Sequence, residues 1–78
     1  MKLEIIKPDQ TLYTGEVSLV QLTGIDGSLE ILNHHAPLIS ILVKGKIKIV
    51  DNENQTFFYE VNGGVVEVKN NTVLILAE

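Results

Sequence analysis

The chain has 78 residues, with ten acidic residues against six lysines, no arginine and no cysteine, which gives a net charge of −4. Disulfides and thiolate metal sites are therefore excluded, and the absence of clustered positive charge argues against nucleic acid as a partner. No apolar run reaches the roughly 20 residues of a membrane-spanning helix, and the first ten residues lack the apolar region of a secretory signal. The length predicts one domain covering residues 1–78.

Aliphatic residues must supply most of the core, because aromatic residues make up only 5% of the chain, and the many Val and Ile residues favour β-strands. In chain order we expect strands at 2–6, 16–22, 28–32, 38–43, 46–50, 56–61, 65–68 and 72–76. No stretch of about ten residues shows a 3.6-residue apolar stripe, so we expect no helix. The prediction is an all-β fold, a two-sheet antiparallel β-sandwich or flattened barrel of eight to ten short strands.

Several of these runs carry more specific expectations. Asp26-Gly27 is typical of a tight hairpin, since it readily supplies positive φ angles. The stretch 38–43 is almost wholly apolar, which predicts a strand buried on both faces or crossing a corner of the sandwich. In the stretch 46–50 the alternation predicts that Ile47 and Ile49 face inward. Gly63-Gly64 is expected to interrupt a strand with a bulge or a close backbone approach, because a phosphate-binding loop would need a lysine and a following helix.

The residues that could carry chemistry are few and scattered. His34 and His35 are adjacent, and neighbouring residues on an extended segment point to opposite faces, so they cannot chelate one ion together. The serines lack a nucleophile elbow, and the carboxylates are spread along the strands rather than paired. We therefore expect a protein that is not an enzyme, with no catalytic site, no metal site, no cofactor and no small-molecule substrate of its own.

The segment from Gly24 to Leu38 has a distinctive pattern, in which a Gly-x-x-Gly start is followed by Leu and Ile and then by His-Ala-Pro-Leu. It resembles the hallmark loop of ATP synthase epsilon subunits, and it matches that pattern at Gly24, Gly27, Leu29, Ile31, His35, Ala36, Pro37 and Leu38. The block Gly63 to Val68, followed by Val73 to Ala77, is similar to the family's Gly-Gly-x-x-Glu-Val motif and closing strand. Tyr13 to Val17 matches an early family pattern, so the resemblance covers nearly the whole chain.

The chain departs from the family pattern at two points of the hallmark loop. Glu30 stands where many members have Gly, and Asn33-His34 replaces Pro-Gly. The family's two-helix C-terminal hairpin, which can restrain ATP hydrolysis, has no counterpart before Glu78. We therefore expect the β-sandwich part of an epsilon subunit without the hairpin's regulatory role.

The resemblance implies a non-catalytic central-stalk, or rotor, subunit of a proton-translocating rotary ATP synthase. Such a subunit links the gamma subunit to the ring of c subunits and supports the coupling of ion flow to ATP synthesis. It would be a peripheral membrane protein through the complex, at the cytoplasmic face of the bacterial inner or cell membrane.

By the same resemblance, two contact regions are expected. The loop that faces the c-ring would contain Ser28, Glu30, Asn33, His34 and His35. The region that docks the gamma subunit would contain Ala36, Pro37, Leu38, Gly63 and Gly64.

Two other classes of small β-sandwich remain alternatives. A lipoyl or biotinyl carrier needs a modifiable lysine at an exposed hairpin tip, typically beside Met, Asp or Ala, and the candidate Lys44-Gly45-Lys46 does not match. A carbohydrate- or peptide-binding module would present exposed aromatic platforms. Phe57 and Tyr59 stand at i and i+2, so we expect them to face the core or to pair across strands.

Overall fold

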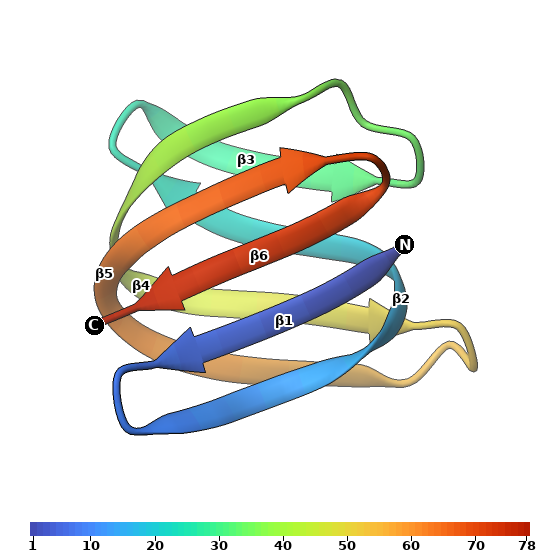
Figure 1. The fold of residues 1–78 in the computed structure, drawn as a ribbon, viewed down its shortest axis with the longest axis horizontal. Coiled ribbons are helices and arrows are strands. Elements are labelled where there is room, and N and C mark those ends of the chain that lie inside the picture. The colour runs from blue at the N-terminus through green and yellow to red at the C-terminus, as the bar shows by residue number, and fades with distance from the viewer.

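A computed structural model describes all 78 residues as six β-strands without a helix. The strands are β1 (Lys2–Lys7), β2 (Gln10–Gly24), β3 (Gly27–Leu32), β4 (Leu38–Asp51), β5 (Thr56–Lys69) and β6 (Thr72–Ala77) (Figure 1). Neighbouring strands follow the order β1-β6-β5-β4-β2-β3, and β1 also pairs with β2. Five strands therefore close a ring, while β3 continues the sheet from β2. The all-β prediction is confirmed.

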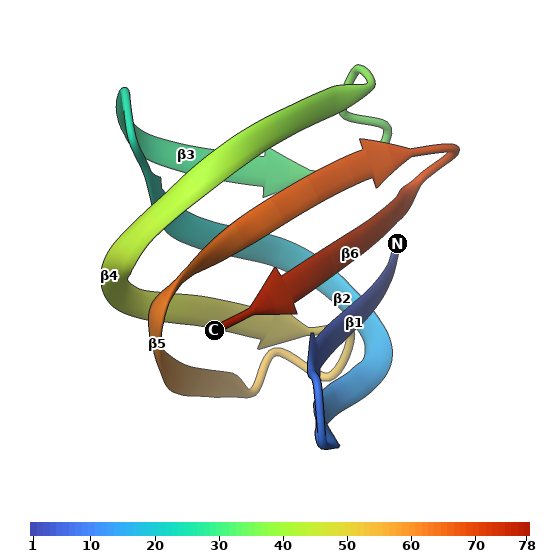
Figure 2. The same ribbon diagram turned by 60° about the vertical axis from the view of Figure 1, so that its left-hand side comes forward.

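The expected count of eight to ten short strands is wrong, because the longest strands run through the predicted breaks. β4 has 14 residues and joins the stretches 38–43 and 46–50, and β5 has 14 residues and joins 56–61 and 65–68. β2, with 15 residues, begins well before the predicted stretch 16–22. Figures 1 and 2 show that β4 and β5 curve over from one layer of the molecule to the other.

Because the long strands bend, one continuous sheet forms two packed layers. The β6 layer contains β1, β6, the first half of β2, the first half of β4 and the second half of β5. The β3 layer contains β3 and the remaining halves of β2, β4 and β5. The predicted sandwich, or flattened barrel, is therefore built from shared strands.

The expectation of a wholly antiparallel arrangement fails at one position, where β1 and β6 pair in parallel. The other five pairings are antiparallel. A ring of five strands cannot alternate in direction all the way round, so one parallel pair must occur. It falls between the first and last strands of the chain.

A cluster of 16 buried aliphatic residues fills the space between the layers, and no polar side chain is buried with them. Ile47 and Ile49 are buried, as the alternation predicts. Each fully buried side chain of this size stabilises the fold by about 1.5–3 kcal/mol. The stretch 38–43 is not buried on both faces, because Leu42 is buried whereas Ile39 and Ile41 point outward; it fits the predicted alternative, since its strand β4 crosses from one layer to the other.

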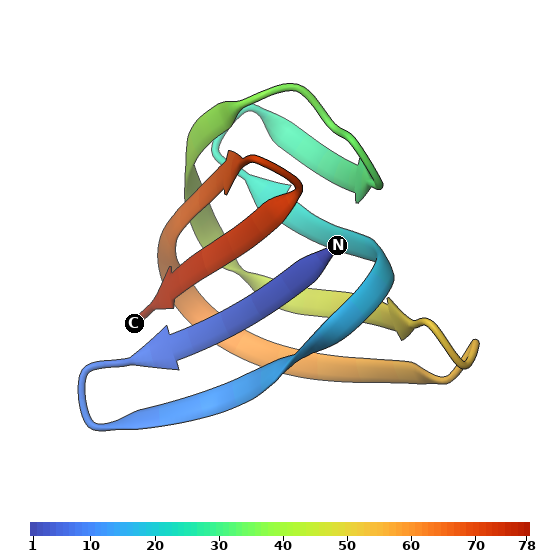
Figure 3. The same cartoon turned by 45° about the vertical axis from the view of Figure 1, so that its right-hand side comes forward.

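Three aromatic rings lie where the first half of β2 passes the first half of β5, as Figure 3 shows for the ribbons. The ring of Tyr13 has centroid distances of 6.1 Å to Phe57 and 6.0 Å to Tyr59. These contacts fit the expectation that Phe57 and Tyr59 face the core or pair across strands, because both rings pack against Tyr13 on another strand. Partial burial, with a contribution from the Asp51 carboxylate, raises the pKa of the Tyr13 hydroxyl above its usual value, so this hydroxyl stays neutral at physiological pH.

The bend of β5 depends on Gly63 and Gly64, whose φ angles are +144° and +148°. A Cβ atom on Gly64 would overlap the backbone carbonyl oxygen of Leu76 on β6. The pair is therefore a close backbone approach, as predicted, within a strand that continues through it.

We expect Gly64→Ala to lower the free energy of unfolding by at least about 2 kcal/mol, because it adds both a steric overlap and an unfavourable φ. Gly45→Ala in β4 is the control, since its new Cβ would make only ordinary contact with Thr23. Its effect should stay within about 0.5 kcal/mol. Urea unfolding of both variants measures the difference, and equal stabilities would contradict this role of Gly64.

Candidate docking surfaces

One side of the molecule carries a row of exposed aliphatic side chains. We call it the outer apolar face and define it by Ile39, Ile41 and Val43 of β4, Val65 of β5 and Leu76 of β6. These are five of the nine large apolar residues that are exposed in the chain. They share the solvent side of the β6 layer, because the residues between them point into the core.

The strand register brings these residues together. Ile41 lies opposite Val65, Val65 lies opposite Leu76, and Leu76 is the partner of Ile6 on β1. An apolar row therefore crosses four neighbouring strands. Patches of this kind on a small protein mark a surface that a partner covers.

The next row across the same strands is mixed in character. Ile39 lies opposite Glu67, Glu67 opposite Leu74, and Leu74 beside Glu4. A hollow of about 160 Å³ lies here, lined by Ile39, Val65, Glu67, Leu74 and Leu76. The outer apolar face thus borders a carboxylate.

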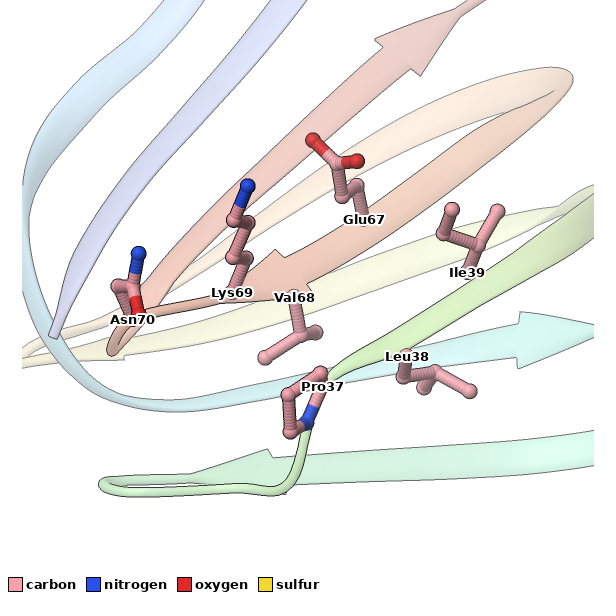
Figure 4. Close-up of a pocket in the computed structure, with 7 residues that line it drawn as sticks. All are labelled: Pro37, Leu38, Ile39, Glu67, Val68, Lys69 and Asn70. Atoms are coloured by element: carbon pink, nitrogen blue, oxygen red, sulfur yellow. The ribbon is translucent and has the colours of Figure 1, made fainter.

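A larger open groove of about 590 Å³ adjoins the start of β4. It is lined by Pro37, Leu38, Ile39, Glu67, Val68, Lys69 and Asn70 (Figure 4). In this view Ile39, Glu67 and Lys69 project from one side of the ribbon and Val68 from the other. The groove joins two residues of the predicted gamma-docking region, Pro37 and Leu38, to the outer apolar face.

The other predicted docking residues lie elsewhere. Ala36 is exposed in the loop before β4, whereas Gly63 is buried opposite Val43 near the middle of the β4–β5 ladder. Gly64 lies beside Gly63, against the backbone of β6. The outer apolar face lies between these two groups and was missed. Both sides of the stretch 38–43 are apolar, so the sequence pattern could not tell which side faces solvent.

The loop after β3 is held by hydrogen bonds from two other parts of the chain. The amino group of Met1 donates to Asn33 Oδ1 at 2.7 Å and to the Val17 carbonyl at 3.0 Å. The backbone N–H of His34, whose φ is +64°, donates to Asn71 Oδ1 at 2.8 Å. Figure 1 shows this loop, the β5–β6 turn and the N-terminus at the same end of the molecule.

The predicted ring-facing residues occupy two kinds of structure. Ser28 and Glu30 are exposed on β3, while Asn33, His34 and His35 are exposed in the loop that follows it. The Nδ1 atom of the His35 side chain lies 2.8 Å from the Ala36 carbonyl oxygen.

No group of three His, Cys, Asp or Glu side chains could hold a metal ion. The structure also has no helix that is long and apolar enough to cross a membrane.

The sequence matches the family described as ATP synthase, Delta/Epsilon chain, beta-sandwich domain, over residues 1–78. It is 34% identical over 77 residues to the ATP synthase epsilon chain of Chlorobium limicola, a match that covers 99% of this chain and 88% of the relative. The family match spans both candidate surfaces.

Two solved structures contain a similar fold. One is the Euglena gracilis mitochondrial ATP synthase, OSCP/F1/c-ring in rotational state 1, with a TM-score of 0.90 at 18% identity. The other is the central stalk and c-ring of the Tetrahymena thermophila mitochondrial ATP synthase, with a TM-score of 0.82 at 24% identity. The matches cover 96% and 99% of this chain, but only 48% and 62% of those chains. At these identities the likeness shows a shared fold.

The Asn71 side chain gives a direct test of how the loop after β3 is held. Asn71→Gly keeps the positive φ accessible but removes the oxygen that accepts the His34 N–H. We expect hydrogen exchange at the His34 amide to become roughly fivefold faster, the effect of losing about 1 kcal/mol. Asn70→Gly is the control, because Asn70 also has positive φ but its side chain makes no hydrogen bond. Equal exchange rates in the two variants would contradict this role of Asn71.

Proposed function

The chain belongs to the β-sandwich family of ATP synthase delta and epsilon chains, and on that premise we propose that it is a non-catalytic rotor subunit of the central stalk. In this role one domain, residues 1–78, links the gamma subunit to the c-ring of a proton-translocating ATP synthase. The subunit supports the coupling of ion flow to ATP synthesis without binding a substrate itself. A densely packed sandwich suits this task, because a part that transmits torque must deform little.

The observation that carries the proposal is the outer apolar face. Obligate interfaces commonly bury about 2,000 Å² or more in total, or roughly 1,000 Å² on each partner. The isolated chain exposes 4728 Å², so such a contact would cover about a fifth of its surface. Small domains have little stability to spare, and a permanent partner on this face would add to it.

We assign the outer apolar face and the adjoining groove to the gamma subunit. This assignment keeps Ala36, Pro37 and Leu38 of the predicted docking region, since they lead into the groove or line it. Gly63 and Gly64 act indirectly, because their bend brings β4, β5 and β6 into one surface.

The c-ring contact is assigned to Ser28 and Glu30 on β3 and to Asn33, His34 and His35 in the following loop. These residues are polar and exposed, which suits a contact with the polar surface of a ring outside the lipid. β3 belongs to the layer opposite the outer apolar face, so both partners can be held at once. Through the ring the subunit is a peripheral membrane protein, and in a bacterial host it lies at the cytoplasmic face.

The two alternative functions lack a supporting site. Lys44 and Lys46 lie within the continuous strand β4, and not at a hairpin tip where a carrier presents its lysine. Phe57 and Tyr59 pack against Tyr13 in tilted and edge-to-face arrangements, which leaves Phe58 as the most exposed aromatic side chain. A carbohydrate-binding platform would need more exposed aromatic surface than this.

The gamma assignment is tested with two matched substitutions. Ile41 is 57% exposed on the outer apolar face, and Phe58 is 60% exposed on the opposite layer. We expect Ile41→Asp to weaken binding of the chain to a purified α3β3γ complex at least roughly tenfold, because a charge would be buried against apolar groups. Phe58→Asp should bind within about twofold of the unchanged chain. Calorimetric titration measures both, and stronger loss with Phe58→Asp would reverse the assignment.

The ring contact is tested by disulfide cross-linking, which the absence of natural cysteine makes specific. Single-cysteine variants Ser28→Cys and His35→Cys are assembled with rings that carry one cysteine in their polar loops. Both variants should cross-link to the c subunit, because β3 and its loop lie along the ring. Asp26→Cys in the β2–β3 turn is the control for random collision, and cross-linking at its level would remove the assignment.

A further inference from the structure

Glu67 is a carboxylate set among aliphatic side chains. It lies between Ile39 on β4 and Leu74 on β6, next to the apolar row through Val65. Glu4, two strands away in the same row, lies 3.9 Å from the ammonium group of Lys2. Lys69 of the same strand projects from the same side as Glu67, but no ion pair joins the two, and Glu67 accepts no hydrogen bond from another side chain. Its carboxylate is therefore unpaired within the uncovered chain.

The hollow beside Glu67 has a composition that restricts what can fill it. Its volume of about 160 Å³ is lined by four aliphatic residues, and Glu67 is the single charged group among them. Arginine and lysine combine an aliphatic stem with a cationic head, so their stems pack on apolar walls while the head reaches an anion.

Covering this face with apolar groups alone would leave a desolvated carboxylate without a partner, which strongly disfavours association. We propose that the partner on the outer apolar face inserts one arginine or lysine into this hollow to pair with Glu67. The proposal rests on the assignment of that face to the gamma subunit. It adds the chemistry by which the partner is recognised.

A second copy of this chain is a poorer occupant. Each chain has a net charge of −4, so two copies repel each other overall, although Lys2 and Lys69 lie on the same side as Glu4 and Glu67. Like charges at a contact disfavour association. Charge complementarity therefore favours a different protein with a basic residue inside an apolar surface.

The experiment compares Glu67→Gln with Glu60→Gln in the full chain, titrated into purified α3β3γ complex at low and high salt. Both residues are exposed on β5, but Glu60 lies opposite Lys46 in the other layer. We expect Glu67→Gln to weaken binding roughly 30-fold at low salt and to reduce its salt dependence, because the buried cation loses its partner. Glu60→Gln should bind within about twofold of the unchanged chain.

A charge reversal supplies a second, independent readout. Glu67→Lys should bind more weakly than Glu67→Gln. Changing the gamma Arg or Lys that pairs with Glu67 to Glu should restore the binding of Glu67→Lys. Unchanged binding of Glu67→Gln, while Ile41→Asp still weakens it, would overturn the pairing and keep the gamma assignment. Failure of the unchanged chain to bind at all would remove the gamma assignment itself. A different outcome is that the chain sediments as a dimer whose population Glu67→Gln changes. That result would identify a second copy as the occupant of the face and would also overturn the proposal.

Discussion

The close approach of the β5 backbone to β6 at Gly64 is the constraint on which the other features depend. It lets one strand leave the β3 layer and enter the β6 layer while it stays in register with β4 on both sides of the bend, where the Asn62 N–H donates to the Glu78 carbonyl. The ring of five strands closes around the core only because the long strands bend in this way. The same bend lines up Ile41, Val65 and Leu76 in one row, so the packing requirement also creates the outer apolar face.

The core and the outer apolar face are built from the same strands, which limits how the chain can change. In β4, β5 and β6 the inward residues fill the space between the layers, and the alternate residues form the outer row. A shift in register would move both sets at once. A surface held in this way stays rigid, which lowers the entropy lost when a partner binds.

The end of the molecule with the loop after β3 has the opposite chemistry. It is polar and exposed, and its shape comes from hydrogen bonds between distant parts of the chain rather than from apolar packing. Asn33 and Asn71 both contribute side-chain oxygens that accept backbone or terminal N–H groups. The chain therefore offers an apolar surface and a polar surface on different parts of its exterior, which fits a subunit that joins two partners.

The sequence by itself determined the all-β class, the Asp26-Gly27 turn between β2 and β3, the inward position of Ile47 and Ile49 and the family resemblance. These depend on neighbouring residues, whose alternation and turn chemistry are local. Tertiary structure alone decided the number of strands, the parallel β1–β6 pair and the direction of Ile39 and Ile41. The reason is physical: where both sides of a strand are apolar, the side that faces solvent depends on which strands lie beside it and which layer it joins.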